Sequence, residues 1–149
     1  MRRDYMLSRD IDWFARCDSY FLHFASNGSI LPINFKHSDL RRIQQAVADA
    51  ELLTDIDDVR INQEWIDRMQ ANGQMEGTTI EDYTRSFKIF AAKGFYSFDW
   101  NLRTEAYELV VSPAEGCPPP RFDERIFPPI ILEEVNENEE YFTYIPNKK

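Results

Sequence analysis

Two histidines and two cysteines are the residues of this chain best suited to acid–base, nucleophilic or metal chemistry. Cys17 and His23 suggest a pair in which the imidazole activates the thiol. A reactive thiol needs an electropositive setting, whereas Cys17 precedes Asp18 in a predicted strand. We therefore interpret Cys17 as a small buried apolar residue. His23 remains a ligand-site alternative, although a structural histidine is the commoner case.

The acidic residues do not define a site by their spacing. The segment Asp55–Asp58 resembles the start of a calcium loop, but glycine is required where Arg60 stands, and Ile66 occupies the position of the final ligand. The five glycines form no phosphate-binding pattern, and no serine-nucleophile or zinc-protease motif is present. We expect no metal and no cofactor. Whether the chain is an enzyme stays undetermined, and the sequence leans towards no catalysis.

A predicted loop at residues 99–103 has the composition of a contact surface. It carries the side chains that most often dominate binding energy, tryptophan and arginine, beside an asparagine. We predict partner contacts from Asp99, Trp100, Asn101 and Arg103. In the alternative, Trp100 folds back onto the core.

The C-terminal segment offers a second contact surface. Residues 133–140 hold five glutamates and no basic residue, and residues 141–145 are apolar again. The latter could bind a partner by adding a strand to its sheet, or could pair within this chain's own sheet. The candidate contact residues here are Glu133, Glu134, Tyr141, Phe142 and Tyr144.

The N-terminal part predicts a three-stranded antiparallel meander over residues 12–35. Asn27-Gly28 favours a tight hairpin turn that pairs Tyr20–Ser26 with Ser29–Phe35. Tyr20, Leu22 and Phe24 then form a core face, whereas His23 lies on a mixed face.

Three helices and a second hairpin follow. Helical spacing and capping residues predict helices from residue 38 or 39 to about 53, from Asn62 to Gln70, and from Thr78 or Thr79 to Gly94. Residues 95–98 and 104–111 alternate as two strands, and Ile130–Leu132 could add an edge strand.

These elements predict an α+β fold. Hairpins from both ends of the chain form one antiparallel sheet, and the three central helices pack on its apolar face. Residues 1–112 form the compact core, and residues 113–149 are a proline-rich and then acidic segment that packs on the same domain.

Charge narrows the choice of partner. The 149 residues carry a net charge of −9, which repels nucleic acid and anionic membranes, and no apolar run is long enough to span a bilayer. With no signal peptide and no cysteine framework, we expect a cytoplasmic protein. We predict a noncatalytic acidic protein (an inhibitor, immunity-type or accessory factor) that binds another protein, with a basic protein as one option. The alternatives are a small-ligand domain or enzyme, and a homodimer joined through an edge strand.

Overall fold

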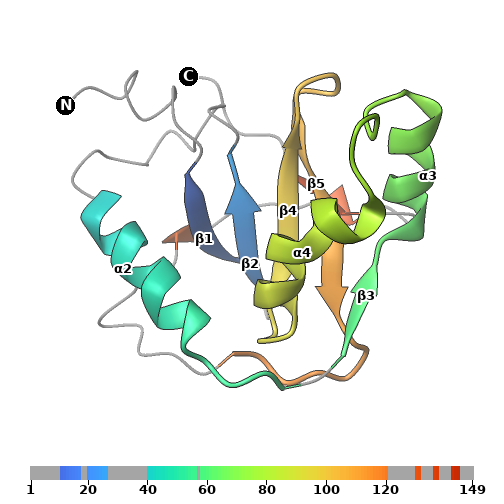
Figure 1. Ribbon diagram of the computed structural model, residues 1–149. Coiled ribbons are helices and arrows are strands. Elements are labelled where there is room, and N and C mark those ends of the chain that lie inside the picture. Colours follow the sequence, from blue (N-terminus) through green and yellow to red (C-terminus); the bar gives the residue numbers. More distant parts are fainter. Residues whose placement is uncertain are drawn as a thin grey trace.

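The described part of the chain folds into a mixed β-sheet with three helices on one side (Figure 1). The computed structural model describes residues 11–17, 20–26, 40–56, 58–120, 130–131, 136–137 and 142–144. The elements are β1 (Asp12–Cys17), β2 (Tyr20–Ala25), α2 (Leu40–Glu51), β3 (Val59–Ile61), α3 (Gln63–Ala71), α4 (Ile80–Ala91), β4 (Tyr96–Asn101), β5 (Ala106–Pro113), β6 (Ile130–Ile131), β7 (Asn136–Glu137) and β8 (Phe142–Tyr144). The predicted α+β class is confirmed, with a sheet built from both ends of the chain and helices between them.

The sheet is mixed, whereas the sequence predicted an antiparallel one. Its order is β6-β1-β2-β4-β5-β8-β7, and β3 also pairs with β5. The pairs β2–β4 and β1–β6 are parallel. The chain between β2 and β4 contains all three described helices, and such a long crossover returns the next strand in the same direction.

The predicted pairing of Tyr20–Ser26 with Ser29–Phe35 is wrong. Over Leu22–Ala25, β2 has β1 on one side and β4 on the other, so neither side is open to a further strand. Residues 27–39, including the Asn27-Gly28 turn, lie outside the described residues. The β1–β2 hairpin itself is confirmed.

Helices α3 and α4 cover the sheet face that carries His23, which was predicted from the sequence to be of mixed polarity. His23 stacks on Phe90 of α4 with ring centroids 4.0 Å apart, and Ala25 packs with Trp65 of α3 and Phe87 of α4. The prediction that the helices cover the Tyr20, Leu22 and Phe24 face is therefore wrong for α3 and α4, whereas α2 contributes Ile43 to the cluster on that face. This face can be buried beneath the helices because its polar side chains form hydrogen bonds within the protein.

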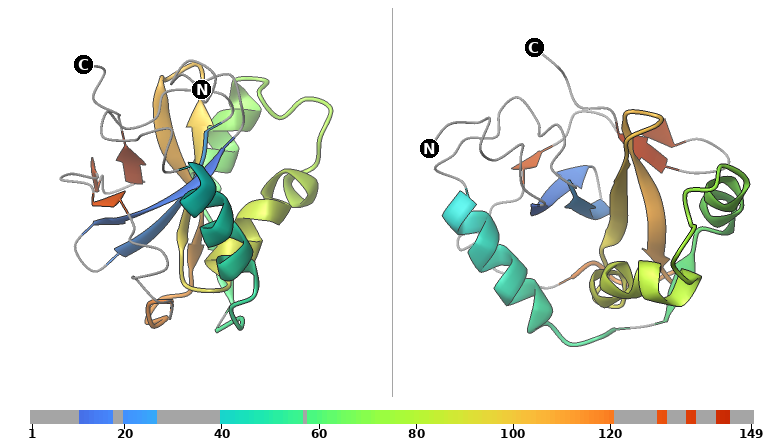
Figure 2. Two further views of the ribbon diagram at one scale, coloured as in Figure 1. Left: turned by 90° about the vertical axis from the view of Figure 1, so that its left-hand side faces the viewer. Right: turned by 45° about the horizontal axis from the view of Figure 1, so that its top comes forward.

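The opposite face is buried because the sheet is curled. Ile131 of β6 and Asn136 of β7 are joined by a chain that spans at most about 18 Å. In a flat sheet the six strand spacings between β6 and β7 would measure about 29 Å. The sheet must therefore bend, and Figure 2 shows β6, β7 and β8 on the side away from the helices.

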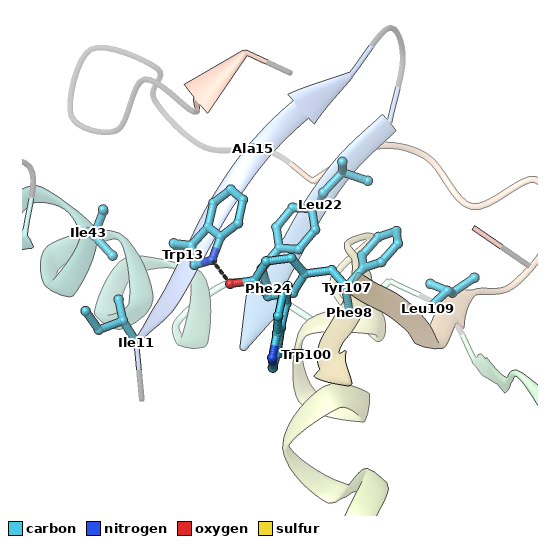
Figure 3. Close-up of a cluster of buried hydrophobic side chains, with 10 residues drawn as sticks. All are labelled: Ile11, Trp13, Ala15, Leu22, Phe24, Ile43, Phe98, Trp100, Tyr107 and Leu109. Atoms are coloured by element: carbon cyan, nitrogen blue, oxygen red, sulfur yellow. Dashed lines mark hydrogen bonds between the residues drawn. The ribbon is translucent and has the colours of Figure 1, made fainter. Parts of the chain in front are cut away.

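Aromatic side chains fill the concave face (Figure 3). Trp13 stacks on Phe24 with centroids 4.1 Å apart, and Phe24 stacks on Phe98 at 4.8 Å. Trp13 Nε1 donates a hydrogen bond to the Tyr107 hydroxyl at 3.3 Å, and Trp100 packs edge-on against Tyr107. Flat rings in contact let three neighbouring strands share one core.

The ends of α4 follow its sequence signals. Thr79 Oγ1 accepts a hydrogen bond from the Asp82 amide at 3.1 Å, as a capping residue should. Gly94 has a φ of +106°, and the amides of Gly94 and Phe95 donate to Ala91 and Phe90 in a Schellman arrangement. This glycine also allows close contact, because a Cβ there would lie 3.0 Å from the Pro118 carbonyl oxygen.

We predict that Gly94→Ala lowers the free energy of unfolding by about 2 kcal/mol or more, since it adds both backbone strain and a clash. Gly77→Ala is the matched control, because Gly77 also has positive φ but no atom within 4 Å of its Cβ position. Urea denaturation measures both. An equal loss in the two variants would contradict a close contact at Gly94.

Candidate functional site

A row of polar side chains runs across the sheet beneath α3 and α4. It comprises His23 of β2, Ser97, Asp99 and Asn101 of β4, and Glu108 of β5. His23 lies opposite Ser97, and Asp99 lies opposite Glu108. Each of the five is at most 5 % exposed. Such groups must be hydrogen-bonded within the protein, because burying them unpaired costs about 1–3 kcal/mol each.

One end of the row has the composition of a hydrolase triad. His23 Nε2 lies 2.8 Å from Asp12 Oδ1, and His23 Nδ1 lies 3.1 Å from Ser97 Oγ. Because a carboxylate only accepts, Nε2 carries a proton and Nδ1 accepts from the serine hydroxyl when the ring is neutral. In serine hydrolases a histidine in this position activates the serine as a nucleophile.

The burial of this group prevents that chemistry in the folded state. Ser97 has no exposed surface, and the ring of Phe90 covers His23. A nucleophile must reach a substrate carbonyl, and none can approach Ser97 here. The Asp12–His23–Ser97 group therefore ties β1, β2 and β4 together, and the ligand-site alternative at His23 has no opening to solvent.

The middle of the row is a hydrogen bond between Tyr83 and Asp99. The Tyr83 hydroxyl of α4 donates to Asp99 Oδ2 at 2.6 Å. Burial, followed by the charge of Asp99 and this hydrogen bond, raises the pKa of the Tyr83 phenol far above its usual value. Tyr83 is thus a fixed donor that attaches α4 to the sheet.

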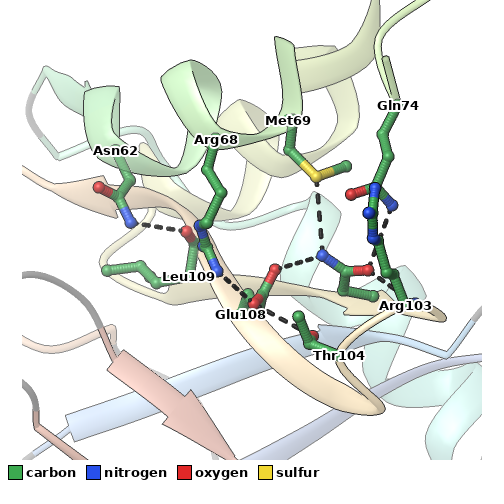
Figure 4. A network of polar contacts seen from close by, with 9 residues as sticks. Asn62, Arg68, Met69, Gln74, Arg103, Thr104, Glu108 and Leu109 are labelled. Carbon is green, nitrogen blue, oxygen red and sulfur yellow. Dashed lines mark hydrogen bonds and ion pairs between the residues drawn. The ribbon is translucent and has the colours of Figure 1, made fainter. Parts of the chain in front are cut away.

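Glu108 anchors the far end of the row (Figure 4). Its carboxylate accepts from Arg68 Nη1 of α3 and from Asn101 Nδ2, each at 2.7 Å, and from Thr104 Oγ1 at 3.2 Å. Asn101 Oδ1 in turn accepts from the Arg103 amide at 2.9 Å. Asn101 therefore ends β4, begins the turn, and holds Glu108 in place.

Three of the four residues predicted as loop contacts lie inside the protein. Asp99, Trp100 and Asn101 belong to β4, so their placement on an exposed hairpin tip is wrong. The turn lies further along the chain, at residues 102–105, because the Asn101 side chain stabilises it there. Arg103 is exposed on this turn beside Leu102, which is 81 % exposed.

The predicted C-terminal contacts are only partly within the described residues. Glu133, Glu134 and Tyr141 lie outside them. Phe142 and Tyr144 belong to β8, which pairs with β5 through Tyr144 and Tyr107. Of the two alternatives, pairing within the chain's own sheet is the one that the structure has. The predicted edge strand at Ile130–Leu132 is present as β6.

The structure also contains a pocket of about 350 Å³ that is open to solvent and was not predicted from the sequence. It lies where the end of α4 meets the chain after α2 and the proline segment, and Lys93 contributes to its wall. The Lys93 ammonium donates to the Leu53 carbonyl oxygen and to Asp55 Oδ1, both at 2.8 Å. The sequence offered little indication of this pocket, because a lysine just before the glycine that ends a helix is usually explained by its favourable interaction with the helix dipole.

The described residues contain no group of three histidine, cysteine or acidic side chains that could hold a metal ion. None of the described helices is long and apolar enough to cross a membrane. Comparison with known proteins finds no family model that matches the chain and no similar curated protein or solved structure.

We predict that Tyr83 makes the stability fall at alkaline pH. Its folded-state pKa is raised, so its contribution is complete below the usual tyrosine pKa of about 10 and is lost as pH rises above it. Above about pH 10, the unfolding free energy of the wild type should fall more steeply than that of Tyr83→Phe, by about 1.4 kcal/mol per pH unit. Urea unfolding at several pH values measures the slopes, and the other tyrosines cancel in the difference. Equal slopes would contradict the assignment.

We predict that Ser97 is inert. A fluorophosphonate that labels activated serines should leave the intact mass of the native protein unchanged. Ser97→Ala should lower the unfolding free energy by about 1–2 kcal/mol, because His23 loses a hydrogen-bond partner. Labelling that depends on both Ser97 and His23 would show that this site opens in solution.

Proposed function

We propose that this chain is a noncatalytic binding protein whose acidic surface engages another protein, one with a basic face. The observation that carries the proposal is that, within the described part of the chain, the polar groups that most resemble a catalytic set are committed to the interior. His23, Ser97, Asp99 and Glu108 are all buried and bonded to neighbouring elements. Catalysis needs a reactive group that a substrate can reach.

The distribution of charge supports the same proposal. The chain carries a net charge of −9, and among the described residues exposed acidic side chains outnumber exposed basic ones. In the Asp82–Arg85 ion pair both side chains are largely exposed. Exposed charge of one sign attracts a partner of the opposite sign and accelerates association, and added salt weakens the attraction.

The glutamate-rich segment of residues 133–140 is the part of the proposal that a variant tests most directly. We predict that changing all five of its glutamates to glutamine weakens a salt-sensitive complex, because it removes five negative charges from one stretch of chain. The substitutions are at Glu133, Glu134, Glu137, Glu139 and Glu140. Native mass spectrometry of tagged protein recovered from its host's lysate, at low and at high salt, is the measurement.

The matched control removes five negative charges elsewhere, at exposed positions of the described helices and their flanks: Glu51→Gln, Asp67→Asn, Glu76→Gln, Glu81→Gln and Asp82→Asn. A larger loss in the first variant would locate the interface at residues 133–140. An equal loss in both would support a general acidic surface. A complex unaffected by salt and by both variants would overturn the proposal.

The alternative of a small-ligand-binding domain is favoured by one observation, the pocket beside Lys93. In the lysate experiment, a bare chain that carries a small-molecule mass would support it.

A further inference from the structure

We infer that the pocket beside Lys93 binds a small carboxylic acid with a compact apolar body. This inference does not depend on the proposed binding of a protein partner. The pocket is lined by Leu53, Thr54, Ile56, Lys93, Pro118 and Pro119. Its volume of about 350 Å³ falls in the lower part of the range of about 300–1,000 Å³ seen for small-molecule sites. Four of the six lining residues are apolar, and they would surround the body of the ligand.

Lys93 supplies the polar anchor. Its side chain is only 7 % exposed, although it ends in an ammonium group. An ammonium has three donor hydrogens, and the described residues provide two acceptors, the Leu53 carbonyl and Asp55 Oδ1. The described residues thus leave one donor for a ligand oxygen, and a hydrogen bond from a buried cation to a carboxylate is among the strongest that a site can make.

Asp55 behaves as a replaceable partner. Its side chain is 70 % exposed, whereas the lysine that it contacts is buried. Because the Asp55 carboxylate is mostly exposed, water can solvate it when a ligand carboxylate takes its place on Lys93, and the buried ammonium keeps a charged partner. Asp55 would thus compete with the ligand and make the empty site stable.

The apolar side of the pocket is held in place by the glycine at the end of α4. Gly94 allows Pro118 and Pro120 to approach the helix end within distances that a side chain would not permit. Prolines also have fixed backbone φ angles, so this wall is preorganised. A flat or branched apolar group suits such a wall, whereas a polar one would lose its hydration without replacement.

The test uses two probes of the same shape, phenylacetate and the neutral phenylacetamide. Both are titrated into the full chain labelled with ¹⁵N, and amide chemical shifts are followed. We expect saturable changes at residues 53–56 and 93–94, with phenylacetate bound about tenfold more tightly than phenylacetamide because only it is charged. No saturable change up to roughly 10 mM, or equal binding of both probes, would overturn the inference.

Two variants separate the site from general charge effects. Asp55→Asn removes the competing carboxylate and should tighten phenylacetate binding by about two- to fivefold. Asp82→Asn removes the same charge from an exposed ion pair on α4 and should leave binding unchanged. An equal effect of both variants would indicate long-range charge alone and would overturn the site.

Lys93→Met should abolish the preference for phenylacetate over phenylacetamide. If this variant does not fold, as judged by circular dichroism, the comparison of Asp55→Asn with Asp82→Asn decides, because neither removes a buried group. A preference that persists in folded Lys93→Met would show that another group holds the carboxylate and would overturn the assignment.

Discussion

Burial of the central strands on both faces is the constraint on which the rest of the structure depends. Strands β2, β4 and β5 lie between the helices on one side and the curled aromatic face on the other. Their side chains alternate, so a polar residue in these strands cannot avoid burial by facing outwards. His23, Asp99 and Glu108 are therefore paired with residues from other elements, and these pairs hold α3, α4 and β1 to the sheet. These side chains resemble a set of catalytic groups, but their hydrogen bonds fix the helices and strand β1 to the central sheet.

The curl of the sheet helps to bury the aromatic face, to which the described helices contribute Ile43 of α2. A flat sheet would leave Trp13, Phe24 and Phe98 open to water, but the short chain between β6 and β7 draws the two edges together. Stacked rings then bury one another across three strands. Apolar area removed from water contributes about 25 cal/mol per Å² whichever element covers it, so strands that curl over these rings stabilise the fold in the same way as a packed helix would.

Local signals predicted the elements, whereas pairing between distant segments could not be read from the sequence. The capping of α4 by Thr79 and Gly94 depends on residues within a few positions, and it was predicted correctly. The strand next to β2 was predicted wrongly. Asn27-Gly28 favours a turn, but it carries no information that β4 occupies the position beside β2. The same limit applies to the site. Lys93 and Asp55 are 38 residues apart, and only the packing of α4 against the chain after α2 brings them together.

The difference between Lys93 and His23 shows where function can reside in such a fold. Both are buried, and both contact an aspartate that is partly exposed. Both nitrogens of His23 are engaged and its face is covered by Phe90, so its bonding is complete. Among the described residues Lys93 has acceptors for two of its three donor hydrogens, and it lies in the wall of a pocket. A polar group whose hydrogen bonds are all made stabilises the fold. A desolvated group with a hydrogen bond still unmade instead favours binding, because a ligand that supplies the missing partner lowers the free energy of the complex. By this criterion the interior of the sheet is structural, and binding is expected at the ends of the helices and on the acidic surface.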